Sequence, residues 1–281
     1  MSTPRPRGQQ NTGPAMGLTA PRGSARREHA ALRSLRKVPE VTAYFWVIKL
    51  LTTGMGETTS DYLVHQLDPP VAVALGGSGL AIALALQLWA RRYVPGIYWL
   101  TVVMVAIFGT MAADAVHIGL GIPYLVSTVF FAGALAVIFA AWYAREKTLS
   151  IHSIDTRARE LFYWATVMAT FALGTAAGDM TAITLRLGYF SSGVLFAVVI
   201  AVPALGYRLG GLNAIGAFWF AYIVTRPLGA SLADWLGRAR RLGGLGLGTG
   251  PVSLCLALVI VGVVGYLSVT HADTRGAPGV G

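Results

Sequence analysis

One pattern occurs four times in this sequence and constrains its fold more than any other feature. An aromatic residue and a tryptophan are followed after nine residues by glycine, and after three more by a small residue and aspartate. The four segments are FWVIKLLTTGMGETTSD (45–61), YWLTVVMVAIFGTMAAD (98–114), YWATVMATFALGTAAGD (163–179) and FWFAYIVTRPLGASLAD (218–234). Because they align without gaps, the sequence predicts four copies of one structural unit in parallel orientation.

Each copy of the pattern lies in a long apolar run, and a second apolar run follows it. The chain is 55% hydrophobic and 12% charged, about half the charged fraction of a soluble domain. Runs long enough to cross a bilayer as helices cover 41–64, 71–90, 96–117, 123–143, 160–183, 190–207, 213–235 and 251–269. We predict an all-α polytopic membrane protein with eight transmembrane helices, built from four parallel two-helix repeats. These repeats cover about 41–92, 94–146, 159–210 and 213–270, within a transmembrane domain over 41–270.

The distribution of Lys and Arg predicts the orientation of the chain. Residues 1–40 are rich in Pro, Gly and Arg and read as a disordered basic tail. If this tail is cytoplasmic, inner segments hold sixteen Lys and Arg and outer loops four, so both termini, including residues 271–281, are expected in the cytoplasm. The loop over 236–250 departs from this trend. The net charge of +10 then indicates anionic lipid headgroups and no nucleic-acid partner.

Four aspartates share one register, 15 residues beyond the tryptophan of each pattern. At 1.5 Å per residue they lie about 22 Å along each helix, near one common depth in the outer part of the membrane. A carboxylate is disfavoured at the negative C-terminal end of a helix, so a fourfold recurrence favours an acidic ring that binds a cation. The predicted ion-binding residues are Asp61, Asp114, Asp179 and Asp234, with the hydroxyls of Thr52, Thr170 and Thr225, which share a second register.

Glu57 has no acidic counterpart in the other three copies and lies one helical turn before Asp61. The two acids can share a proton or a metal ion. We expect Glu57, Asp61 and Asp179 to be metal ligands. Arg226 is the expected charge partner of Glu57, because pairing lowers the cost of burying both groups. Lys49 is a second coupling candidate, with its side chain reaching toward the inner surface.

The remaining features of the pattern have structural interpretations. The glycines, each paired with a small residue four positions later, predict close packing of helices at Gly56, Gly109, Gly174 and Gly229. The aromatic pairs read as anchors at the membrane interface. His65 and His117 are expected in solvated loops. The single Cys255 excludes a disulfide framework within the chain. No catalytic triad or cofactor motif is present, so neither an enzyme nor a cofactor is predicted.

The segments VPEVTAYFWVIKLLTTGMGETTSDYL, LFYWATVMATFALGTAAGD and AFWFAYIVTRPLGASLADWL resemble a bacterial family of integral membrane proteins usually called "membrane-anchored protein". The resemblance covers about residues 38–270. It implies a multi-pass protein of the bacterial inner (plasma) membrane. It implies no established activity.

These observations favour a secondary transporter for a cation, exporting it or exchanging it for protons. Carboxylate, hydroxyl and carbonyl oxygens suit a hard divalent metal such as Mn²⁺. The alternative is a non-transporting membrane scaffold or sensor, in which the tail carries the interactions and the acids are structural. An organic-cation carrier is a third possibility. It is less favoured, because few aromatic residues lie near the acids. The sequence leaves the oligomeric state open.

Overall fold

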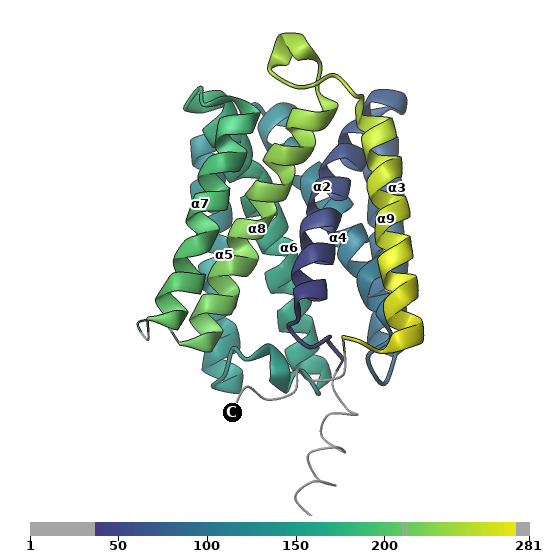
Figure 1. The fold of residues 1–281 in the computed structure, drawn as a ribbon, viewed down its shortest axis with the longest axis vertical. Helices are drawn as coiled ribbons and strands as arrows, with labels where there is room; N and C mark the ends of the chain where they lie inside the picture. Colours follow the sequence, from purple (N-terminus) through teal and green to yellow (C-terminus); the bar gives the residue numbers. More distant parts are fainter. Residues whose placement is uncertain (1–36, 210, 212, 274–281) are drawn as a thin grey trace, which may run out of the picture. The chain divides into compact units, whose positions relative to one another are not determined.

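The computed structural model describes residues 37–209, 211 and 213–273 of the 281-residue chain. Most of the predicted tail over residues 1–40 lies outside these residues, as does the predicted C-terminal tail beyond residue 273. The described part is all-helical, as the sequence predicts (Figure 1). Its long helices are α2 (Ala43–Gln66), α3 (Pro69–Trp89), α4 (Pro95–Asp114), α5 (Tyr124–Glu146), α6 (Arg157–Asp179), α7 (Gly188–Arg208), α8 (Ala214–Gly237) and α9 (Thr249–Thr270).

The helices begin where the sequence provides capping residues. The Thr42 hydroxyl accepts a hydrogen bond from the backbone N–H of Phe45, and Asn213 accepts one from Gly216 at 2.7 Å. Proline occupies the first turn of α3 and α4, where its missing N–H costs no hydrogen bond. Short helical segments also lie at η1 (Ala115–Gly119), η2 (Ile151–Ser153), η3 (Met180–Thr184) and η4 (Arg240–Leu242).

Within the described residues, six helical segments are long and apolar enough to cross a membrane: α3, α4 with η1, α5, α6 with η3, α7 and α9. The chain is therefore a multi-pass membrane protein. The other two long helices, α2 and α8, carry charged residues in their central turns, among them Lys49, Glu57 and Arg226. Those side chains are at most 2% exposed, so the charges face neighbouring helices.

The eight helices form an inner ring and an outer layer. The inner helices α2, α4, α6 and α8 contact one another in cyclic order, with α8 packed against α2. Each outer helix packs mainly on the inner helix of the following repeat: α3 on α4, α5 on α6, and α7 on α8. The last outer helix, α9, packs on α2 and completes the same relationship. The four sequence repeats thus form a closed, pseudo-fourfold arrangement.

The repeated glycines bring the inner helices together, as predicted. A β-carbon on any of them would lie under 3.0 Å from an atom of the next inner helix. In every case the atom belongs to the residue three positions before the next glycine of the cycle. The pairs are Gly56 with Ala106, Gly109 with Phe171, Gly174 with Arg226, and Gly229 with Thr53. Close approach of backbones is the usual way in which helices associate in a bilayer.

The aromatic pairs that begin the four patterns pack inside the bundle, so their interpretation as interface anchors is wrong. Six of these eight side chains are at most 4% exposed. Their rings contact across neighbouring inner helices because the parallel repeats place them at one level. The contacts are Phe45 with Trp99 (5.8 Å between ring centres), Tyr98 with Trp164 (5.6 Å) and Tyr163 with Trp219 (6.3 Å), and the hydroxyls of Tyr98 and Tyr163 lie 2.5 Å apart. We call this the aromatic end of the ring, and the opposite end, which carries the aspartates, the acidic end.

Candidate functional site

Arg226 of α8 occupies the centre of the inner ring and is fully buried. Its Nη2 atom donates to Glu57 Oε2 at 2.7 Å and to the Thr175 hydroxyl at 2.7 Å. It also donates to the hydroxyl of Thr110, and Nη1 lies 3.5 Å from the carbonyl oxygen of Thr53. One guanidinium therefore joins α2, α4, α6 and α8, and its pairing with Glu57 is the one that the sequence led us to expect.

The groups around Arg226 come from one position of the repeat. Glu57, Thr110, Thr175 and Ala230 each follow the glycine of their copy, and the first three contact the guanidinium. The fourth copy supplies the arginine itself, four residues before Ala230. A single acid in one copy and a single base in another thus make a neutral pair at the centre of an otherwise symmetric ring. Hydrogen bonds to the remaining groups lower the cost of burying an ion pair; within the described residues the Nη atoms of Arg226 have partners and its Nε has none.

Lys49 lies between this central pair and the aromatic end. Its side chain is 1% exposed, so the expected reach toward the surface is not observed. The Nζ atom lies 4.1 Å from the ring centre of Phe171 and 4.0 Å from that of Tyr222. Within the described residues it has no hydrogen-bond partner. Interactions with the aromatic faces, each about 2 kcal/mol when desolvated, are what stabilises this cation.

At the acidic end, Arg238 pairs with two of the four aspartates. Its Nη2 atom lies 3.0 Å from Asp61 of α2, and its Nε donates to Asp234 of α8 at 2.8 Å. The guanidinium also lies over the ring of Tyr189, 5.4 Å from its centre. Arg238 belongs to the loop whose positive charge contradicts the orientation trend. Two neighbouring carboxylates account for a base at this position.

The other two aspartates form a separate cluster with a histidine. Carboxylate oxygens of Asp114 and Asp179 and a ring nitrogen of His117 all lie within 4.8 Å of one another. His117 is 5% exposed, so the expectation that it lies in a solvated loop is wrong. His65 is exposed as expected, but it lies in the last turn of α2 and not in a loop. Neither Asp114 nor Asp179 has an ion pair with a base in the described part of the chain.

A change in helix type accompanies this cluster. Immediately after Asp114 and Asp179, α4 and α6 continue as the π-helical turns η1 and η3. In the other two copies the α-helix runs on past the aspartate, to Gln66 and Gly237. Single π-turns within helices are frequent at functional sites. The acidic ring expected from the sequence is therefore split into a half in which Asp61 and Asp234 pair with Arg238 and a half in which Asp114 and Asp179 have no base in the described residues.

The structure does not bring all the predicted ligands together. The metal set of Glu57, Asp61 and Asp179 is divided, because Glu57 pairs with Arg226, Asp61 pairs with Arg238, and Asp179 lies beside Asp114. The predicted threonines do not reach the acids either. Their hydroxyls donate to backbone carbonyls of their own helices: Thr52 to Lys49 (2.9 Å), Thr170 to Val167 (2.7 Å) and Thr225 to Ala221 (2.6 Å).

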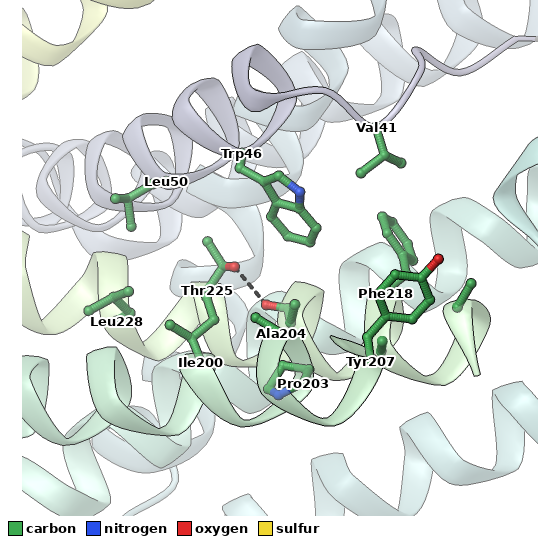
Figure 2. Close-up of a pocket in the computed structure, with 13 residues that line it drawn as sticks. Val41, Trp46, Leu50, Ile200, Pro203, Ala204, Tyr207, Phe218, Thr225 and Leu228 are labelled. Atoms are coloured by element: carbon green, nitrogen blue, oxygen red, sulfur yellow. Dashed lines mark hydrogen bonds between the residues drawn. The ribbon is translucent and has the colours of Figure 1, made fainter. Parts of the chain in front are cut away.

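A pocket of about 510 Å³ lies apart from these charges, between α2, α7 and α8 (Figure 2). Trp46, Pro203, Phe218 and Leu228 are among its lining residues, and in the described part of the chain the lining includes no acid or base. Thr225 also lines this pocket, and its hydroxyl donates to the carbonyl of Ala221 in the same helix. Such a lining suits an apolar group and not a cation.

Sequence reasoning missed Arg238, His117, Thr110 and Thr175. The two threonines do share the register of Glu57, and this signal could have identified them. For His117 the only signal was its place three residues after Asp114; its burial follows from the π-turn. Arg238 follows Asp234 by four residues, the spacing of a helical ion pair.

Comparison with known proteins agrees with the repeat structure. A family model described as Repeat of Unknown Function (DUF347) matches the chain four times, at residues 44–93, 97–148, 162–209 and 217–273. No curated protein and no solved structure gives a significant match. The chain belongs to this repeat family, and the four predicted repeats are confirmed. The name "membrane-anchored protein" stays a prediction.

Proposed function

We propose that this four-repeat chain is a secondary transporter for a divalent metal cation, in which all eight long helices, α2 and α8 included, span the bacterial inner membrane. Both termini are cytoplasmic, so the acidic end faces outward. The observation that carries the proposal is the stack of charged groups inside the inner ring. From one end to the other it consists of four aspartates, the Glu57–Arg226 pair and Lys49, all within segments of membrane-spanning length. Intramembrane ionisable residues mark ion pathways more often than they stabilise a fold.

The path through the ring is closed in two places. Arg226 fills the centre, and a divalent cation approaching its guanidinium to 4 Å would be repelled by about 4 kcal/mol per unit charge at an effective dielectric constant of 20. On the other side of Arg226, the packed rings of the aromatic end close the path through the inner ring. This is the arrangement of a carrier closed on one side and acidic on the other.

Release of Arg226 is the proposed coupling step. Protonation of Glu57, or binding of a cation beside it, removes the charge that holds the guanidinium. Arg226 would then be held only by neutral groups, among them the hydroxyls of Thr110 and Thr175, and could leave the centre of the ring by giving up those bonds. A proton arriving from one side can in this way be exchanged for a metal ion that leaves toward that same side.

Metal flux into proteoliposomes tests the proposal directly. The full chain, reconstituted with and without a proton gradient, should take up Mn²⁺ faster than empty vesicles, and Glu57→Gln should abolish the response to the gradient. Asp155→Asn, at an exposed pair with Arg159, is the matched control. Absence of flux in the parent chain under both conditions would remove the carrier proposal.

A growth screen separates the carrier from the scaffold alternative. A deletion strain expressing the aspartate variants should lose tolerance to Mn²⁺ and change its metal content, at normal abundance of the protein in the membrane. A defect found only on deleting residues 1–40 would support a scaffold or sensor instead. Orientation can be measured on a Cys255→Ser background by labelling Leu247→Cys from outside and Arg157→Cys from inside.

A further inference from the structure

We propose that Asp114, His117 and Asp179 bind one divalent transition-metal ion, and that this three-residue site selects the metal. The inference rests on the proposed function for its role in transport, and it adds the class of substrate and the residues that choose it. It moves the metal site from the predicted set of Glu57, Asp61 and Asp179, in the first and third repeats, to the second and third repeats. Repeats 1 and 4 then supply the half in which Arg238 pairs with the aspartates.

The spacing of the three groups suits a single ion. Their ligand atoms lie within 4.8 Å of one another. Metal–ligand bonds of about 2.1 Å require three ligands of one ion to lie within about 3.6 Å of one another. Closure by up to about 1.2 Å, through side-chain rotation, is therefore needed to complete the site. The two carboxylates come from neighbouring inner helices, α4 and α6, at the equivalent position of the repeat.

His117 provides the observation that an acidic cluster alone would lack. The side chain is 5% exposed, and its Nε2 atom is buried without a hydrogen-bond partner in the described residues. A buried ring nitrogen without a hydrogen bond is energetically unfavourable. Beside two unpaired carboxylates, a bound cation would remove that cost, because Nε2 would become a ligand.

The other ring nitrogen is held in the form that metal binding requires. His117 Nδ1 lies 2.8 Å from the Ser127 hydroxyl, and that hydroxyl donates its single proton to the carbonyl of Tyr124 at 3.0 Å. With its proton on a backbone carbonyl, the Ser127 hydroxyl accepts from Nδ1–H, and we propose this tautomer, which leaves a free lone pair on Nε2. The Tyr124 ring, 4.7 Å from the imidazole, fixes its plane. Metal-binding histidines are usually oriented by such an outer hydrogen bond.

The ligand types identify the class of ion. Mg²⁺ and Ca²⁺ prefer sites made of oxygen alone, whereas imidazole nitrogen with carboxylate suits Mn²⁺, Fe²⁺, Co²⁺ and Zn²⁺. The same end of the ring also contains Asp61 and Asp234, which form ion pairs with Arg238. A metal ion is consequently expected beside repeats 2 and 3 and repelled from the half that holds Arg238.

Binding of Co²⁺ and Mn²⁺ to the purified full chain in detergent tests the site without requiring transport. We expect one Co²⁺ per chain by visible absorption, displaced by Mn²⁺ and not by an equal concentration of Mg²⁺. His117→Gln and Asp179→Asn should weaken Co²⁺ binding at least tenfold. His65→Gln, an exposed histidine at the same end, should leave it unchanged. Equal affinity in all four proteins, or no Co²⁺ bound by the parent chain, would overturn the site.

A measurement on the parent chain covers the case in which a variant does not fold. Electron spin-echo envelope modulation of Mn²⁺ bound to the parent chain should show a coordinated imidazole nitrogen, because His117 is one of the proposed ligands. A spectrum with oxygen ligands alone would contradict the proposal. Binding without flux in proteoliposomes would remove the carrier and leave the site. Flux that survives His117→Gln with its metal preference unaltered would remove the site and leave the carrier.

Discussion

Gly174 of α6 lies directly against the aliphatic part of the Arg226 side chain, and a β-carbon there would overlap Arg226 Cβ and Cγ. The Arg226 side chain fits at the centre of the ring because α6 presents no side chain at Gly174. A glycine that the sequence marks only as a packing residue therefore also determines where the central charge can be.

Gly174→Ala should destabilise the protein by about 1–3 kcal/mol, the cost of overpacking a close-packed site. Because Arg226 is tied to three helices, it has little freedom to move aside. The thermal midpoint in detergent measures the effect. Gly262→Ala in α9, where a new methyl group meets nothing within 4 Å, is the control. An equal midpoint for the two variants would show that the contact carries no strain.

The Glu57–Arg226 pair should give a strongly non-additive double-mutant cycle. Either Glu57→Gln or Arg226→Gln leaves one buried charge without its partner, at a cost of about 3–5 kcal/mol. The double variant, with neither charge, should be more stable than Arg226→Gln alone. Unfolding free energies of the four proteins give the coupling. Asp155→Asn at the exposed pair with Arg159 should cost at most about 1 kcal/mol. Additive losses would argue against a direct interaction.

Arg238→Gln should destabilise the acidic end by about 1.5–3 kcal/mol, the contribution of hydrogen bonds to a charged group. Arg240→Gln, at an exposed base whose Nε donates to the carbonyl of Leu245 at 3.3 Å, should have no measurable effect. The comparison of thermal midpoints checks both. If the carrier proposal holds, Arg238→Gln should also permit a second cation to bind beside Asp61 and Asp234, which equilibrium binding of Co²⁺ would detect.

Titration of Arg238 itself should cause no change in its contribution between pH 6 and pH 9. Burial lowers the pKa of Arg238, but Asp234 and Asp61 outweigh it, so the pKa is raised above its ordinary value of 12.5. A base with a raised pKa in the folded state contributes its full stabilisation below the unfolded-state value. A difference between the parent and Arg238→Gln that varies with pH in this range would then report titration of the carboxyl groups.

Lys49→Met should leave stability unchanged or increase it. The ammonium is buried between Phe171 and Tyr222 with no hydrogen bond from the described residues, and a thioether of similar length keeps the packing without the desolvation cost. The thermal midpoint checks this expectation. A midpoint lowered by several degrees would mean that the two ring contacts exceed the cost of burying the charge.

The fold followed from the sequence because the dominant signals were periodic and local. Apolar runs gave the helices, and the glycine register gave the contacts between them, so α2 and α8 were recognised despite Glu57 and Arg226. The Glu57–Arg226 pair was predicted because two opposite charges in an apolar interior have few other groups to pair with.

The division of the aspartates was not predicted, because it depends on Arg238 in a loop and on π-turns after Asp114 and Asp179. Neither has a periodic signature. The inward-facing aromatic pairs were misread because tryptophan near the end of an apolar helix is equally typical of an interface.

The packing of α9 on α2 has a consequence for the order of the repeats. The backbone N–H of Glu40, just before the first repeat, donates to the carbonyl of Asp273, just after the last, at 3.3 Å. The beginning and the end of the ring are thus neighbours, and the chain is a cycle that happens to be cut between its fourth and first units. Joining those ends and opening the chain in the polar segment between α5 and α6 should yield a circular permutant with the same ring, in which the repeat that bears Glu57 is third instead of first.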